Sequence, residues 1–129
     1  MGLLLDTHVF VWAASAPERL TNAARSAIED PSNAVFVSAA VAWEIAIKHG
    51  LGKLALPSDP PTYFPARITA LGFRSLAIAQ EHALAVRSLP NHHRDPFDRI
   101  MIAQAIVEGL TFVTADEAAT RYSVRVLVT

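Results

Sequence analysis

At 129 residues the chain is long enough for one compact domain, 1–129, and too short for two. Hydrophobic residues make up 52% of it, which predicts a well-filled core or an apolar surface kept for a partner, and the formal net charge of −1 argues against a broadly basic nucleic-acid binder. The lack of cysteine excludes disulfides and thiolate metal sites and favours the cytoplasm, and no apolar run approaches the roughly 20 residues of a membrane span.

The first half of the chain is predicted to alternate strands with helices. The opening stretch "MGLLLDTHVF" has no basic region and reaches an acid at Asp6, so we expect a buried strand there rather than a signal peptide. Ser38 is a favoured residue before a helix, and Gly50 is a favoured residue at a helix end. In chain order we predict a strand at 2–6, helices at 7–15 and 21–30, a strand at 34–38 and a helix at 39–50.

The second half continues the alternation after a proline-rich stretch. Four prolines between residues 57 and 65 predict a loop, and Pro90 is expected to end the helix that precedes it. Asp95 and Gly109 are expected to begin and end the next helix. The predicted elements are a helix near 62–71, a strand at 74–78, an amphipathic helix at 79–89, a polar loop at 91–95, a helix at 96–109, a strand at 110–114, a short helix at 115–122 and a strand at 124–128.

This alternation predicts an α/β fold. Strands that are separated by helical stretches form a central, mostly parallel sheet with helices on both faces. In such sheets, ligands bind outside the carboxyl ends of the strands. Polar residues that directly follow a predicted strand are therefore the first candidates for a functional site.

Two aspartates stand three residues apart in "RDPFDR", where the polar loop turns into the helix predicted at 96–109. Asp95 is a strong N-cap candidate because Pro96 follows at the favoured first helical position. Asp98 would be the third helical residue, where a carboxylate also suits the helix dipole. The stretch alone leaves open whether both residues stabilise the helix or one of them holds a metal ion.

Three further acids each have a structural interpretation when taken singly. Asp6 and Asp116 can cap the helices that follow them, and Glu44 can form an exposed ion pair with Lys48 that contributes ~0.3–0.5 kcal/mol. Asp6, Asp98 and Asp116 nevertheless fall at the same predicted sheet edge, and Glu44 lies about two turns into a helix that leaves that edge. Converging carboxylates repel one another unless a cation lies between them. Oxygen ligands without cysteine indicate Mg²⁺ or Mn²⁺ rather than zinc.

Four segments of the chain resemble those of PIN-domain ribonucleases, in particular the VapC-type toxins of bacterial toxin–antitoxin pairs. The segments are "LLLDTHVFVW", "SAAVAWEIAIKHGLGKL", "HHRDPFDRIMIAQA" and "GLTFVTAD", in the family's order and with similar spacing. They span essentially the whole domain, so the resemblance implies a PIN-like fold. It also implies a catalytic, metal-binding acidic cluster, while Asp95 keeps its capping role, and Glu117 is a neighbouring acid beside the fourth position. The cluster falls on Asp6, Glu44, Asp98 and Asp116, with Thr7 and Thr114 as polar neighbours.

The resemblance also implies a function. We expect a metal-dependent endoribonuclease that hydrolyses RNA phosphodiester bonds with Mg²⁺, or Mn²⁺ in its place, and acts as the toxin of a toxin–antitoxin pair. Thr7, Thr114 and Arg99 are the residues expected to contact the RNA substrate. A small antitoxin is the expected partner, seated in a hydrophobic groove that Trp12 and Trp43 are candidates to line. The expected assembly is a homodimer, and a heterotetramer or larger with the antitoxin.

Other classes of protein share some of these sequence features. A haloacid-dehalogenase-like phosphatase also begins with a strand that ends in aspartate, but it needs a second acid where this chain has His8. A PIN-domain nuclease that processes RNA without an antitoxin, and a PIN-fold binding module without catalysis, remain as alternatives. The adjacent histidines His92 and His93 have two interpretations, a phosphate contact or an ordinary solvated loop.

Overall fold

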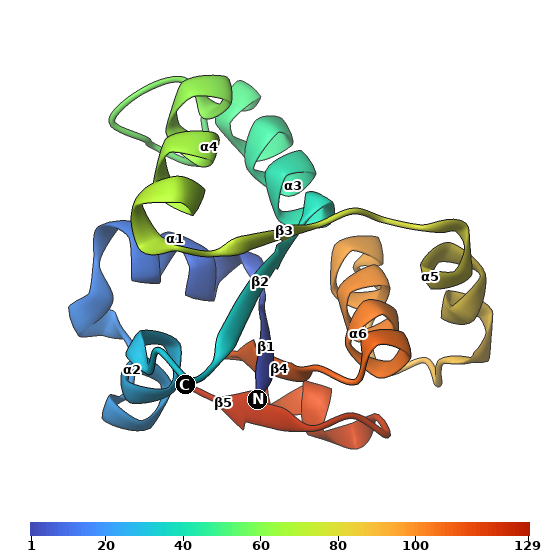
Figure 1. The fold of residues 1–129 in the computed structure, drawn as a ribbon. Coiled ribbons are helices and arrows are strands. Elements are labelled where there is room, and N and C mark those ends of the chain that lie inside the picture. Colours follow the sequence, from blue (N-terminus) through green and yellow to red (C-terminus); the bar gives the residue numbers. More distant parts are fainter.

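The computed structural model describes residues 1–129 and contains one five-stranded sheet in the order β3-β2-β1-β4-β5. Every neighbouring pair of strands is parallel, so the predicted α/β class with a mostly parallel sheet is confirmed. Figure 1 shows α1 and α2 on one side of the sheet and α5 and α6 on the other. The strands are β1 (Gly2–Leu5), β2 (Ala34–Ser38), β3 (Arg74–Leu76), β4 (Thr111–Thr114) and β5 (Val126–Val128).

Six α-helices and three short 3₁₀ segments connect the strands. None of the helices is both long enough and apolar enough to cross a membrane. The α-helices are α1 (Thr7–Ser15), α2 (Asn22–Glu29), α3 (Ala39–Gly50), α4 (Pro60–Leu71), α5 (Gln80–Ala85) and α6 (Pro96–Glu108), and the 3₁₀ segments are η1 (Pro17–Arg19), η2 (Val86–Ser88) and η3 (Glu117–Arg121).

The helix predicted near 62–71 is confirmed as α4, but it begins two residues earlier, at Pro60, within the proline-rich stretch. Pro60 and Pro61 occupy the first turn of the helix, where a backbone N–H has no helical partner and its absence costs nothing. Pro65 lies further inside the helix and removes one hydrogen bond there. The predicted loop is therefore confined to the residues before Asp59, which is the N-cap.

Two other predicted helices are shorter or tighter than expected. The helix predicted at 79–89 is α-helical only to Ala85 and then continues as η2. The Arg99 guanidinium donates to the carbonyl oxygens of Val86 and Leu89, so these carbonyls are engaged from outside the helix. The helix predicted at 115–122 is the 3₁₀ segment η3.

The central strand β1 places the site. Leu3, Leu4 and Leu5 are fully buried, and Leu5 pairs with Val37 on β2 and Val113 on β4. Because all three strands run in the same direction and in this register, they end at one edge of the sheet. Helix α6 leads into β4 from the opposite edge, so its N-terminus also lies at the edge where the strands end.

The N-terminus of α6 offers a test of the capping role of Asp95. Its Oδ1 accepts a hydrogen bond from the Phe97 backbone N–H at 2.8 Å, as the sequence predicted. Asp95→Ala should lower the free energy of unfolding by about 0.5–2 kcal/mol, and Asp95→Asn by less, because asparagine caps nearly as well. Both variants remove the same charge beside Asp98, so the difference between them isolates the cap. Equal stability of the two variants in chemical denaturation would contradict this role.

Candidate functional site

A cavity of about 290 Å³ lies at the edge where the strands end. It brings together all four acids predicted from the sequence, and Asp95 is a fifth acid in its wall. The acids come from four parts of the fold: the end of β1, the middle of α3, the N-terminus of α6, and the segment that follows β4. The lining residues are Asp6, Thr7, His8, Glu44, Lys48, Asp95, Asp98, Ala115 and Asp116.

Asp6 is held rigidly at the end of β1. Its Oδ1 accepts from the Val9 backbone N–H at 2.9 Å and so caps α1, and its Oδ2 accepts from the Thr114 hydroxyl. Only 7% of the residue is exposed. Burial raises the pKa of the Asp6 carboxyl above its usual range, although the Thr114 and Val9 hydrogen bonds oppose that rise.

Glu44 forms the predicted ion pair with Lys48, but the pair is not on an exposed helix face. Glu44 is 5% exposed, because its position on α3 faces the cavity and not the solvent. The Thr7 hydroxyl donates to Oε1 at 2.6 Å, and the Lys48 ammonium donates to Oε2 at 2.5 Å. The hydrogen bond to Glu44 raises the pKa of Lys48. Both oxygens of Glu44 are therefore oriented by side chains of the cavity wall.

Asp98 is the least compensated of the four predicted acids, because among its neighbours only His93 opposes the rise in its pKa. Its carboxylate takes part in none of the hydrogen bonds and ion pairs that hold its neighbours. Burial, followed by the nearby charge of Asp95, raises the pKa of Asp98 to about 6. The charges of Asp6 and Glu44 contribute in the same direction, as expected of carboxylates that share one cavity.

Asp116 is oriented by His93, a residue outside the predicted acidic cluster. The Asp116 Oδ2 lies 2.7 Å from His93 Nε2, and its Oδ1 accepts from the Ala118 backbone N–H at 2.9 Å. These hydrogen bonds, the Ala118 bond first, lower the pKa of Asp116. The His93 side chain is only 8% exposed, so the solvated-loop interpretation of this histidine is wrong. The sequence placed both His92 and His93 in a polar loop before Asp95, and nothing in that pattern predicted which of the two would contact Asp116.

The three predicted substrate contacts occupy different places. Thr7 and Thr114 line or support the cavity, but each donates its hydroxyl hydrogen to an acid. Arg99 does not line the cavity, because consecutive residues of a helix point about 100° apart and Asp98 faces the acids. The Arg99 guanidinium donates at 2.9 Å to the carbonyl oxygen of Pro90, and it also donates to the carbonyl oxygens of Val86 and Leu89.

The arrangement has the chemistry of a site for a hard cation. Carboxylate oxygens dominate the cavity wall, and Lys48 is the one lysine among them. Burial is the first cause of the raised pKa of both Asp6 and Asp98, and neighbouring carboxylates add to it, so a negative charge is costly at both positions. Oxygen ligands of this kind suit Mg²⁺ and Mn²⁺. The residues present therefore fit a divalent ion.

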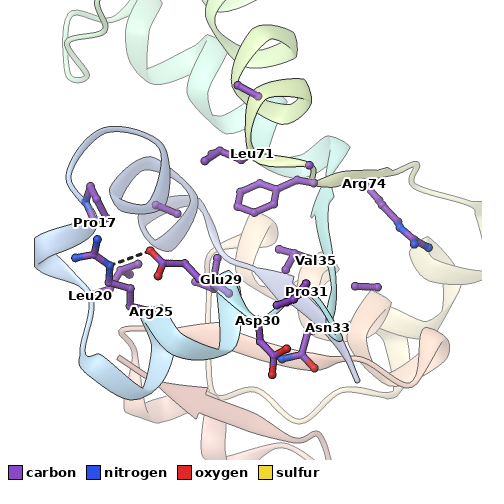
Figure 2. A pocket seen from close by; sticks show the side chains of 16 residues that line it. Pro17, Leu20, Arg25, Glu29, Asp30, Pro31, Asn33, Val35, Leu71 and Arg74 are labelled. Atoms are coloured by element: carbon purple, nitrogen blue, oxygen red, sulfur yellow. Dashed lines mark hydrogen bonds and ion pairs between the residues drawn. The ribbon is translucent and has the colours of Figure 1, made fainter.

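A larger cavity, about 520 Å³, lies at the opposite edge of the sheet, where β2 and β3 begin (Figure 2). Its acids are already satisfied within the chain. Glu29 pairs with Arg25 at 2.9 Å, as Figure 2 shows, and Asp30 accepts hydrogen bonds from Ser32. This larger cavity therefore lacks the uncompensated charge that marks the smaller one.

Glu81, His82 and Glu108 form a second group of side chains whose potential metal-ligand atoms lie within 4.8 Å of one another. The Ala79 backbone N–H donates to His82 Nδ1 at 2.9 Å, so a neutral His82 carries its hydrogen on Nε2. That nitrogen lies 3.7 Å from a Glu108 oxygen and has no lone pair to offer an ion. His82 thus stabilises the start of α5.

Comparison with known proteins agrees with this geometry. The family model of the PIN domain matches residues 3–124. Ribonuclease VapC22 of Mycobacterium tuberculosis is 33% identical over 116 residues, which cover 88% of this chain and 86% of the relative. Ribonuclease VapC16 of the same organism is 39% identical over 61 residues, which cover 47% of this chain and 43% of the relative, less than half its length.

The fold is also found among solved structures. The structure of VapBC2 from Rickettsia felis, bound to a DNA fragment from its promoter, superposes with a TM-score of 0.76 and covers 100% of this chain and 99% of that chain. Sequence identity is 15%, so this likeness concerns the fold. The family model and the similarity to VapC22 each extend over most of the sequence, and the chain therefore belongs to the PIN domain family, with VapC-type ribonucleases among its relatives.

Proposed function

We propose that the chain is a metal-dependent endoribonuclease and the toxin of a toxin–antitoxin pair, acting in the cytoplasm on RNA. One observation carries the proposal: Asp6, Glu44, Asp98 and Asp116 line one cavity at the carboxyl edge of a PIN-domain sheet. The relatives named ribonuclease VapC22 and VapC16 support the same activity.

We assign these four acids as the residues that hold Mg²⁺, or Mn²⁺ in its place. When bound, such an ion supplies charge stabilisation at the scissile phosphodiester and activation of water. The chain's own contribution is to orient the acids. Because the Thr7 and Thr114 hydroxyls already donate to Glu44 and Asp6, we assign these threonines an orienting role in addition to the predicted substrate contact.

The proposed antitoxin groove lies next to this cavity. Trp43 is 59% exposed and packs edge-on against Phe97, with the ring centroids 5.0 Å apart. Trp12, in contrast, is partly buried against the core. Trp43 is therefore the better of the two predicted candidates, and we propose that an apolar antitoxin segment occupies the groove beside it. That groove measures about 510 Å³ and is lined by Trp43, Ile78, Ala83, Val86, Arg94, Pro96, Arg99 and Ile100.

The first test is metal dependence. Purified protein should cleave single-stranded RNA with Mg²⁺ or Mn²⁺ and stop when EDTA is added, because the acids need a cation between them. Cleavage products are followed on a denaturing gel, with readdition of the ion as the control. Undiminished cleavage in EDTA would exclude the metal mechanism, and no cleavage with any ion would favour the binding-module alternative.

The second test separates Asp98 from a purely structural residue. Asp98→Asn keeps the size of the side chain and removes its charge. Loss of a residue that only hydrogen-bonds a metal ligand lowers activity roughly 10- to 100-fold. Asp98→Asn should lower the rate of RNA cleavage by more than this, because it removes a proposed ligand itself. The melting temperature of the metal-free protein should stay unchanged or rise, because repulsion among the carboxylates is relieved. A variant that cleaves normally would remove Asp98 from the site.

The pH dependence of stability follows from the same residue. The pKa of Asp98 rises from 3.8 to about 6 on folding, so protonation stabilises the metal-free fold. This contribution is complete below about pH 4 and is lost as the pH rises through about 6. Melting temperatures of the metal-free protein should therefore fall between about pH 4 and pH 7, and the fall should be smaller in Asp98→Asn. Identical profiles for the two proteins would contradict the raised pKa.

The third test concerns the partner. Expression of this chain alone should arrest bacterial growth, and a co-purifying small protein, when co-expressed, should relieve the arrest. Asp98→Asn is the matched control, because it should be expressed without arresting growth. Harmless expression of an active, folded nuclease would favour the alternative of an RNA-processing enzyme without an antitoxin.

A further inference from the structure

His93 is a polar residue beside the cavity that the proposed function does not use, and its side chain makes several contacts. It lies in the loop between η2 and α6, yet its side chain is only 8% exposed. One ring nitrogen, Nε2, is 2.7 Å from Asp116 Oδ2, and the other, Nδ1, is 3.0 Å from the Tyr122 hydroxyl. The imidazole also stacks on the Tyr122 ring, with the planes 23° apart. Both of its nitrogens are thus engaged.

These two contacts determine which nitrogen carries the hydrogen. An ionised carboxylate can only accept, so Nε2 must donate its hydrogen to Asp116. In a neutral imidazole, Nδ1 is then the acceptor, and it takes the hydrogen of the Tyr122 hydroxyl. The chain of hydrogen bonds therefore runs in one direction, from Tyr122 through His93 to Asp116.

Both ends of this chain are anchored. Tyr122 is 4% exposed and belongs to the hydrophobic core, and it follows η3 directly, whereas Asp116 precedes η3 as its N-cap. His93 therefore bridges the two ends of one short 3₁₀ segment. The ring of His92 packs edge-on against the same tyrosine, at 4.9 Å between centroids.

The loop that carries His93 is also held on both sides. Before it, the Arg99 guanidinium donates to the carbonyl oxygens of Leu89 and Pro90. After it, Asp95 caps α6. Arg99, which lies on α6, thus holds the start of this loop in place, so its role is structural.

A competing interpretation makes His93 a metal ligand. Ligand atoms of His93, Asp98 and Asp116 lie within 4.8 Å of one another, close enough to share an ion. A histidine binds a metal through a nitrogen that has a free lone pair, however, and here the nitrogen that faces the acids carries the hydrogen. The Tyr122 hydroxyl is compatible with this arrangement, because it can donate its hydrogen to the unprotonated Nδ1.

We propose that His93 is a positioning residue, which holds the Asp116 carboxylate at the cavity through its Nε2–H and does not ligate the metal. The inference rests on the proposed function, since it assigns Asp116 to the metal site. Hydrogen-bond partners of metal ligands orient those ligands, and their loss costs roughly 10- to 100-fold in metal affinity.

One experiment determines, in the absence of metal, which ring nitrogen of His93 carries the hydrogen. Nitrogen-15 NMR of the histidine-labelled, metal-free protein in mildly alkaline buffer should show His93 protonated at Nε2 and unprotonated at Nδ1. Tyr122→Phe keeps the ring and removes the hydroxyl, so this preference should weaken. A wild-type His93 protonated at Nδ1 would overturn the proposal.

A second experiment measures Mn²⁺ binding by titration and pulsed electron paramagnetic resonance. His93→Ala should raise the dissociation constant roughly 10- to 100-fold. His93→Gln should restore most of the affinity, because its amide still offers an N–H donor, and His92→Ala should bind Mn²⁺ like the wild type. Wild-type Mn²⁺ should show no coupling to a coordinated imidazole nitrogen. Unchanged affinity in His93→Ala, or such a coupling, would overturn the proposal.

The outcomes separate this inference from the proposed function. If the wild type cleaves RNA and binds Mn²⁺ while His93→Ala binds it equally well, only the role of His93 is wrong. If the wild type neither binds Mn²⁺ nor cleaves RNA, the proposed function fails and the positioning role fails with it. Melting curves for every variant show whether a lost affinity reflects the loss of one hydrogen bond or of the fold.

Discussion

Mutual repulsion among carboxylates at one edge of a parallel sheet is the constraint on which the rest of this structure depends. Parallel pairing of β2, β1 and β4 brings the ends of these strands to the same edge, and the polar residues that follow them must share that space. Burial makes the repulsion costly, because charged groups lose their contact with water. The fold tolerates it by surrounding most of the acids with donors.

The acids divide by how the chain compensates them. Asp6, Glu44 and Asp116 each accept hydrogen bonds from two groups of the protein, so their geometry exists before any ion binds. Asp98 accepts none from these donors, and its pKa is raised to about 6. Three acids are thus held in place by the protein, whereas the charge of Asp98 is the one that the chain compensates least.

The acidic cavity and the proposed antitoxin groove share their supporting helices. On α3, Trp43 is the direct neighbour of Glu44, and on α6, Phe97 is the direct neighbour of Asp98. Since adjacent helix residues point about 100° apart, each helix presents an acid to the cavity and an aromatic ring beside it. The contact between the two rings joins α3 to α6 at this point. A partner bound at the aromatic pair would therefore lie next to the acidic cavity.

What the sequence by itself determined was local. The order of strands and helices, the caps at Asp6, Ser38 and Asp95, and the four acids could be predicted because each depends on neighbours within about one helical turn, or on motifs that belong to the PIN family. Tertiary structure decided the partners: Thr7 meets Glu44 across 37 residues, His93 meets Asp116 across 23, and Thr114 meets Asp6 across 108. It also buried Glu44 and directed the Arg99 guanidinium toward backbone carbonyl oxygens instead of the cavity. Such contacts depend on where distant elements pack, and no pattern within a single segment specifies that packing.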